Sequence, residues 1–200
     1  AILNEGDEVI IPTPYWVSYP DMAILADATP VFIEAGLEQD FKITPDQLEA
    51  SITNKSKLFV LNSPSNPTGS VYSESEIKAL GEVLKKYPHV LTISDDIYEH
   101  IRWGDDDFVN IAMACPELKD RVVILNGVSK AYAMTGWRIG YAAGPKNIIE
   151  AMGILQSQST SNPTSISQVA AEAALNSDQS CIIPMVEAFK ERHRFVVDAF

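Results

Sequence analysis

A lysine and an arginine eight residues apart are the residues of this chain best suited to covalent and anion-binding chemistry. Lys130 follows an apolar run with the character of a strand, and Arg138 follows a bend at Gly136. Removing water from an amine lowers its pKa and makes a lysine nucleophilic enough to form a Schiff base. A guanidinium binds a phosphate dianion through paired, charge-assisted hydrogen bonds. Taken alone, the pair is explained more simply as a solvated loop lysine and an ordinary ion-pair arginine.

Three further segments place unusual residues after predicted strands, where ligands collect in open α/β sheets. Two prolines and a glycine between residues 63 and 69 fix a turn that could aim Asn66 into a cleft. Asp95 follows a buried strand, and a carboxylate there needs a cation such as a protonated pyridine nitrogen. Trp16 offers an aromatic face. Together with Lys130 and the phosphate-binding Arg138, this chemistry suggests pyridoxal phosphate. Each feature also has a simpler explanation. The turn at 63–69 could be a plain chain reversal, Asp95 an N-cap or ordinary ion-pair residue, and Trp16 a core tryptophan.

Short apolar runs rich in β-branched residues alternate with longer segments of helical period, which is typical of an α/β protein. Their near-continuous hydrophobicity predicts a mostly parallel sheet covered on both faces. The clearest helix runs from Ser73 to Lys86, has Ser73 as N-cap and Glu76 at the capping-box position, and should cross between two parallel strands. The predicted strands are Glu8–Ile11, Val31–Glu34, Leu58–Asn62, Val90–Ser94, Val122–Leu125 and Ile139–Ala142.

After Pro145 the pattern becomes mainly helical. The predicted helices are Asn147–Leu155, Ser165–Leu175 and Pro184 to the end. The chain has no internal repeat and no Gly/Ser linker, so we expect one α/β domain, a three-layer α/β/α sandwich with a helical C-terminal extension.

Composition excludes several classes of function. With 200 residues and 46% hydrophobic content, the chain can bury a substantial core. Its net charge of −12, without a basic run, argues against binding nucleic acid or an anionic membrane. The isolated Cys115 and Cys181 predict neither disulfides nor a metal site and agree with a reducing cytosol. Glu99 and the range 105–107 have the composition of a solvated acidic loop.

Several ordered motifs together resemble class I pyridoxal-phosphate aminotransferases of fold type I, most closely the bacterial aspartate aminotransferase branch. The resemblance covers nearly the whole chain. It rests on Gly6-Asp7-Glu8-Val9, Pro14-Tyr15-Trp16-Val17-Ser18-Tyr19-Pro20, the segments 63–69, 94–100 and 126–140, and Gln156-Ser157-Gln158-Ser159-Thr160.

The resemblance implies a role for each candidate residue. Lys130 would form the Schiff base with the cofactor and later move the proton of the substrate Cα. Asp95 would keep the pyridine nitrogen protonated, so that the ring accepts electrons. Tyr98 and Asn66 would hydrogen-bond the phenolic oxygen, and Asn66 would also touch the substrate carboxylate. The remaining contacts are ring stacking by Trp16, which would also contact substrate, and phosphate binding by Arg138 and Ser129.

One position departs from the family pattern. Family members often carry a hydroxyl three residues before the lysine, where this chain has Gly127. Ser129 is therefore a weaker phosphate-binding candidate than Arg138, and one phosphate contact has no obvious donor.

The resemblance further implies a ping-pong transfer of an amino group from aspartate to a 2-oxo acid, usually 2-oxoglutarate, by a cytoplasmic homodimer. Residues 1–200 would form the large, cofactor-binding domain. The chain starts at Ala1 inside an apolar run, and the family's N-terminal arm, Gly-rich phosphate loop and C-terminal small domain have no counterpart in it. We therefore expect the segment by itself to bind cofactor weakly and to turn over little.

Two other functions are compatible with the same motifs. Lyases and synthases of fold type I use a lysine, an aspartate and a tyrosine in the same arrangement. Some fold-type-I domains are instead fused to winged-helix modules and sense the cofactor while regulating transcription. The complete set of candidate residues favours an enzyme over a sensor.

Overall fold

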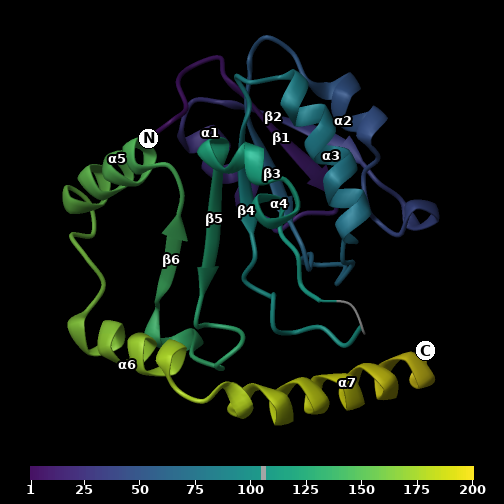
Figure 1. The fold of residues 1–200 in the computed structure, drawn as a ribbon, viewed down its shortest axis with the longest axis vertical. Coiled ribbons are helices and arrows are strands. Elements are labelled where there is room, and N and C mark those ends of the chain that lie inside the picture. The colour runs from purple at the N-terminus through teal and green to yellow at the C-terminus, as the bar shows by residue number, and fades with distance from the viewer. Residues whose placement is uncertain (105–106) are drawn as a thin grey trace.

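The computed structural model describes residues 1–104 and 107–200. Its centre is a six-stranded sheet in the order β2-β1-β3-β4-β5-β6 (Figure 1). The first five strands run parallel, whereas β6 pairs antiparallel with β5. The strands are β1 Glu8–Thr13, β2 Thr29–Glu34, β3 Ser56–Asn62, β4 Leu91–Asp95, β5 Val122–Gly127 and β6 Gly140–Ala143. The predicted α/β class and mostly parallel sheet are confirmed.

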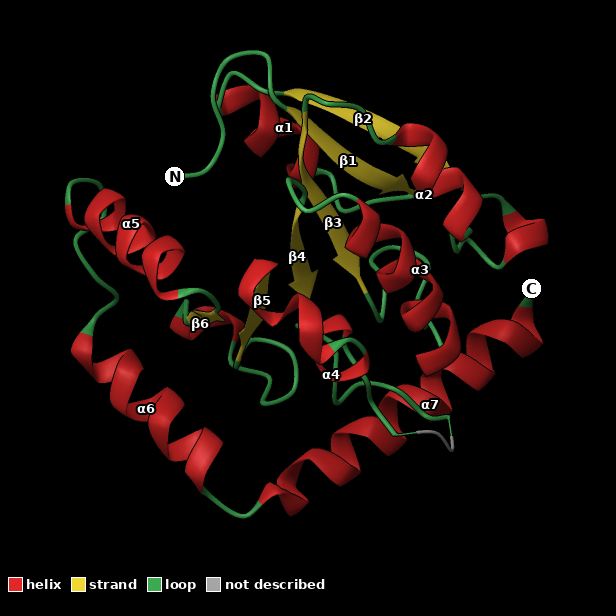
Figure 2. Ribbon diagram, turned by 45° about the horizontal axis from the view of Figure 1, so that its top comes forward, coloured by secondary structure: helices red, strands yellow, loops and turns green. Residues whose placement is uncertain are grey.

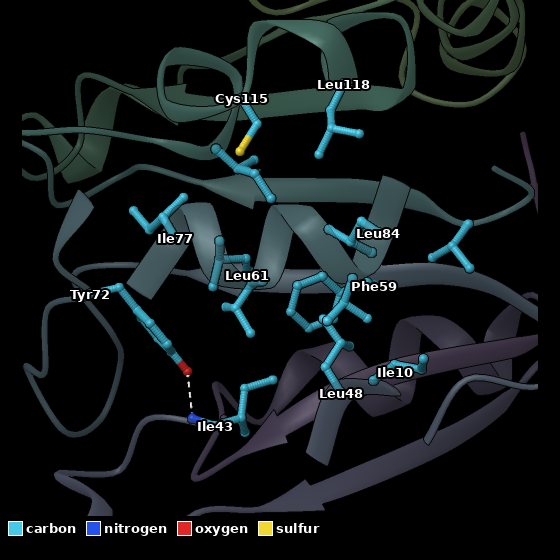
Figure 3. Packing of buried hydrophobic residues seen from close by; sticks show 14 of the residues in the cluster. Ile10, Ile43, Leu48, Phe59, Leu61, Tyr72, Ile77, Leu84, Cys115 and Leu118 are labelled. Carbon is cyan, nitrogen blue, oxygen red and sulfur yellow. Dashed lines mark hydrogen bonds between the residues drawn. The ribbon is translucent and has the colours of Figure 1, made fainter. Parts of the chain in front are cut away.

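One face of the sheet packs against helices α2 (Pro45–Ser51), α3 (Glu74–Lys86) and α4 (Ile111–Ala114). Figure 3 shows the centre of this core, where Phe59 and Ile10 of the sheet meet Leu48 and Leu84 of the helices. All four side chains are at most 1% exposed. Each contributes roughly 1.5–3 kcal/mol through removal of apolar surface from water, so this layer holds the strands, and hence their carboxyl ends, in place.

Helix α3 begins as the sequence predicts. The Ser73 hydroxyl accepts a hydrogen bond from the Glu76 backbone N–H, and the Glu76 carboxylate accepts one from the Ser73 N–H. The acidic first turn and the basic last turn, which contains Lys85 and Lys86, complement the helix dipole. The helix crosses from β3 to β4, which lie side by side in parallel.

The opposite face is covered only in part. Helix α1 (Ser18–Leu25) packs Tyr19 and Ala23 against Val9 and Val60. Between α1 and α5 (Lys146–Ser157) lies an apolar groove of about 300 Å³, whose floor is formed by residues of β1, β3, β4 and β5. The expectation of a sheet covered on both faces is therefore met fully on one side only.

The chain after Pro145 is mainly helical, as predicted. Helices α5, α6 (Ser165–Asn176) and α7 (Ile182–Ala199) follow an arc around the β6 side and the carboxyl edge of the sheet (Figure 2). The Tyr132 hydroxyl, which donates to Gln179 at 2.6 Å, ties this arc to the loop after β5. None of the helices in the described ranges is long and apolar enough to cross a membrane. The 3-10 turns are Leu37–Gln39, Pro116–Arg121, Thr135–Trp137 and Gln179–Cys181.

The structure corrects several details of the prediction. Helix α1 was missed because it is apolar on nearly every side, so that it lacks a helical hydrophobic period. Helices α2 and α4 were missed because they are short. Strand β4 ends at Asp95 and not before it. Glu99 is half-buried and accepts from Asn126 at 2.8 Å, so it is not a solvated loop residue. The predicted acidic loop also includes residues 105 and 106, which lie outside the described residues.

Candidate active site

The parallel strands β1, β3, β4 and β5 end at one edge of the sheet, and this edge opens into a cavity of about 340 Å³. All seven candidate residues line it, although they come from five separate segments of the chain. They are Trp16 before α1, Asn66 after β3, Asp95 and Tyr98 at the end of β4, Ser129 and Lys130 after β5, and Arg138 before β6.

Asp95 lies at the end of β4 and is held on both carboxylate oxygens. The Tyr19 hydroxyl donates to its Oδ2 at 2.6 Å, and the Ile97 backbone N–H donates to its Oδ1 at 3.3 Å. Tyr19 is 9% exposed. Burial, and then the charge of Asp95, raise the pKa of Tyr19 above its usual range, so the phenol stays a neutral donor. The structure therefore presents a fixed carboxylate to the cavity.

Lys130 and Tyr98 face each other across the cavity. The Lys130 Nζ lies 5.4 Å from the centre of the Tyr98 ring, within the range of a cation–π contact. Lys130 is half-buried, so the expected removal of its amine from water is incomplete. The surrounding loop explains this, because Ala133 and Thr135 are exposed.

Arg138 adopts a left-handed backbone conformation with φ of +56°. That region disfavours residues with a side chain, and such strain collects at functional sites. The exposed guanidinium donates from Nη1 to the Thr135 carbonyl at 3.0 Å. This contact holds one nitrogen of the Arg138 guanidinium in the bend after Gly136. The guanidinium thereby brings a permanent positive charge to the cavity.

Gly127 cannot carry a side chain in this structure. It ends β5 opposite Gly140, and a Cβ at Gly127 would lie 2.9 Å from the Ile139 carbonyl oxygen and 3.1 Å from the Gly140 Cα. Backbone atoms cannot move aside as flexible side chains can. The close approach of β6 thus explains why a hydroxyl is absent at this position, while the half-buried Ser129 lines the cavity two residues later.

Sequence reasoning missed other residues that line the cavity. They are Tyr19, Asn62, Ile97, Leu125, Asn126 and Thr135. The first three contact Asp95 directly. Asn62 could have been found by the criterion that selected Asp95, because it also ends a buried strand. Tyr19 follows Trp16 by three residues and packs edge-on against it, with the two ring centres 5.4 Å apart. This proximity could be expected only if α1 had been predicted as a helix.

The cavity has the groups needed for a small, flat, anionic ligand. Trp16 is 40% exposed and offers an aromatic face. A fixed carboxylate at one end suits a protonated ring nitrogen, a guanidinium suits a phosphate, and an amine suits an aldehyde. The donor set therefore fits pyridoxal 5′-phosphate, and the fold and site together define an α/β enzyme domain of the kind that uses this cofactor.

Comparisons with known proteins agree with this class. The family model described as "Aminotransferase class I and II" matches residues 1–200, and the chain belongs to this family. The chain is 65% identical over its full length to an aspartate/prephenate aminotransferase of Nitrosomonas europaea, covering 50% of that protein. It is 57% identical over 99% of its length to an aspartate aminotransferase of Geobacillus stearothermophilus, again covering 50%. The chain thus spans about half the length of the curated relatives it matches.

Solved structures show the same relationship. The aspartate aminotransferase of Rhizobium meliloti superposes with a TM-score of 0.96 at 49% identity, with 98% of this chain and 49% of that one covered. An aspartate aminotransferase from Thermus thermophilus with maleate gives a TM-score of 0.87 at 40% identity, with 96% and 49% covered. The expected family and fold type are therefore confirmed, and pyridoxal phosphate is the cofactor of this family.

Proposed function

We propose that this chain is the cofactor-binding part of a pyridoxal-phosphate aminotransferase that takes its amino group from aspartate. The observation that carries the proposal is the convergence of seven candidate residues from five segments on one cavity. Residues 1–200 would be the large domain of that enzyme, and the site would be completed by parts of the enzyme that this chain does not contain.

Each residue has a task that follows from its chemistry. Asp95, fixed by Tyr19, would hold a proton on the ring nitrogen. Trp16 would stack on the ring, whereas Arg138 and Ser129 would bind the phosphate. Tyr98 and Asn66 would donate hydrogen bonds to the phenolic oxygen. When bound, the cofactor supplies an aldehyde that captures amines and a ring that accepts electrons from the substrate Cα.

Lys130 has two tasks in this proposal. Its amine would first hold the cofactor. Once a substrate amine has replaced it, the freed Lys130 amine would take the proton from the substrate Cα and later give that proton back to complete the transfer. The position of Nζ over the Tyr98 ring supports this, because Lys130 and the groups around the phenolic oxygen lie in the same cavity. Fixed charges that act on the developing carbanion raise the rate more than those that act on the substrate.

The names of the relatives guide the choice of substrate. Proteins called aspartate/prephenate and aspartate aminotransferase match nearly the whole chain, and a structural neighbour was solved with maleate, a four-carbon dicarboxylate like aspartate. We therefore propose aspartate as donor and a 2-oxo acid as acceptor, with 2-oxoglutarate and prephenate as the two acceptors to test. A cytoplasmic homodimer remains the proposal for the complete enzyme.

The proposal is tested by an absorbance titration of the protein with pyridoxal 5′-phosphate. We expect a new band in the visible and near-ultraviolet region for the wild type and its loss in Lys130→Ala. Lys146→Ala, on the exposed start of α5, is the control and should leave the band unchanged. The same band in Lys130→Ala would refute the assignment of the amine.

A further inference from the structure

Asn62 lies between two of the proposed cofactor contacts and touches the backbone of both. It is the last residue of β3 and stands opposite Asp95 in the parallel pairing of β3 with β4. Its Nδ2 donates to the Asp95 carbonyl at 2.9 Å, and its Oδ1 accepts from the Asn66 backbone N–H at 2.8 Å. Asn62 is half-buried and lines the cavity.

We propose that Asn62 is a positioning residue that sets Asn66 and Asp95 at the separation which the cofactor ring requires. This inference rests on the proposed function, in which Asn66 meets the phenolic oxygen and Asp95 the ring nitrogen. The phenolic oxygen and the ring nitrogen of the cofactor are held by one rigid ring. The protein groups that bind them must therefore keep a fixed separation. One planar amide that bonds both backbone segments supplies this constraint without touching the cofactor.

The chemistry of the two bonds specifies asparagine at this position. The Asp95 carbonyl needs a donor and the Asn66 N–H needs an acceptor, so the orientation of the amide is fixed by its partners. Aspartate at residue 62 would keep the bond to Asn66 and lose the bond to Asp95. Alanine would lose both bonds. Glutamine would place the amide one methylene too far from the strand end.

The hydrogen bonds of Tyr19 and Ile97 to Asp95 do not supply this constraint. In the part of the chain that the structure describes, Tyr19 and Ile97 fix the carboxylate of Asp95 and make no hydrogen bond to the turn that carries Asn66. That turn is closed within itself by the Gly69 N–H, which donates to the Ser65 carbonyl at 2.8 Å, and by the Ser65 N–H, which donates to Ser70 at 3.0 Å. The turn therefore behaves as a unit, and Asn62 joins this unit to β4.

The test compares two ligands and two variants. Apo-protein is titrated with pyridoxal 5′-phosphate and with its 3-deoxy analogue, which lacks the phenolic oxygen. For Asn62→Ala we expect about a tenfold loss of affinity for the cofactor, equivalent to about 1.4 kcal/mol, and a clearly smaller loss for the analogue. For Asn62→Asp we expect weaker binding of both ligands with their affinity ratio kept, because the bond to Asn66 survives.

Hydrogen exchange of the apo-protein gives a readout that needs no cofactor. The Asn66 amide should exchange faster in Asn62→Ala and at the wild-type rate in Asn62→Asp. The Ile97 amide, which reports on Asp95, should exchange faster in both variants. Unchanged exchange at Ile97, or equal loss of affinity for the two ligands, would overturn the positioning role and reduce Asn62 to a structural residue.

Failure of the proposed function would look different. If wild-type protein showed no Lys130-dependent cofactor band even at a large excess of cofactor, the proposed function would fall. The joint response of the Asn66 and Ile97 amides would then decide by itself whether Asn62 couples the two segments.

Discussion

At the scale of single residues, the pair formed by the buried Tyr19 and the half-buried Asp95 contributes to both stability and chemistry. A hydrogen bond from a buried phenol to a charged acceptor contributes about 1.5–3 kcal/mol, and this one measures 2.6 Å. Tyr19→Phe keeps the packing against Ala23 and Val9 but removes the donor. We expect its free energy of unfolding, measured by urea denaturation, to fall by this amount.

Tyr15→Phe is the matched control for this experiment. Tyr15 stacks on Phe32 at 5.1 Å, and the substitution preserves that contact. An equal loss of stability in Tyr15→Phe and Tyr19→Phe would show that the hydroxyl of Tyr19 has no special role.

Asp96, next to the site, is a buried carboxyl of a different kind. It is 2% exposed, and it accepts hydrogen bonds from Ser94 and from Asn110, both at 2.7 Å. Burial raises the pKa of Asp96 from its ordinary value of 3.8 to about 6, and the nearby Glu99 and Asp95 act in the same direction. The folded state therefore favours the protonated carboxyl of Asp96 more than the unfolded state does. The resulting contribution to the free energy of unfolding is complete below pH 3.8 and is lost as the pH rises through 6.

Asp96→Asn removes this titration while keeping the shape of the side chain. Its amide can accept from Asn110 and donate to Ser94. We expect the unfolding free energy of the variant, relative to wild type, to rise by about 2 kcal/mol between pH 4 and pH 7. Urea denaturation at both pH values measures the difference. A difference that stays constant with pH would contradict a raised pKa at Asp96, and Asp198→Asn, exposed on α7, controls for general charge effects.

At the scale of elements, the contact between β5 and β6 depends on Gly127. A Cβ there would approach backbone atoms of residues 139 and 140 to within 2.9–3.1 Å. Gly127→Ala should therefore cost about 1–3 kcal/mol of stability. Gly153→Ala in α5, where nothing lies within 4 Å of the added Cβ, should instead stabilise by about 0.5–1 kcal/mol. Thermal unfolding of both variants distinguishes a local steric conflict from a general effect of the substitution.

The start of α3 offers a second test at this scale. Ser73→Ala removes the side-chain acceptor of the capping box and should lower the free energy of unfolding by about 1 kcal/mol. Ser73→Asp retains an acceptor at the N-cap and should therefore keep most of the stability that Ser73→Ala loses. If alanine and aspartate destabilised equally, the loss could not be assigned to a missing N-cap acceptor, and the capping role of Ser73 would be contradicted.

Elements with a strong local signal were predictable from the sequence, and those without one were not. The capping box of α3 and the β-branched runs of the sheet are properties of neighbouring residues. Helix α1 has neither a side-chain cap nor an amphipathic period, and the antiparallel direction of β6 is set by its pairing with β5. The sequence also placed Asp95 outside its strand, because strand ends are set by pairing with neighbours.

At the scale of the whole molecule, the convergence of the candidate residues on one cavity was predictable because the fold brings strand ends to one edge. This is why residues as distant as Trp16 and Arg138 could be expected from the sequence to line one cavity. The particular hydrogen bonds that support Asp95 were not predictable, since those from Tyr19 and Asn62 join residues 76 and 33 positions apart and depend on side-chain packing. The open groove between α1 and α5 likewise depends on packing and not on local pattern.

The most direct test of the proposed role of Lys130 is to reduce the protein with borohydride in the presence of pyridoxal 5′-phosphate and to map the modified peptide by mass spectrometry. We expect the pyridoxyl group on Lys130 and not on the other nine lysines, at the lowest cofactor concentration that gives the absorbance band. Labelling spread over exposed lysines, or concentrated on a lysine outside the cavity, would contradict it.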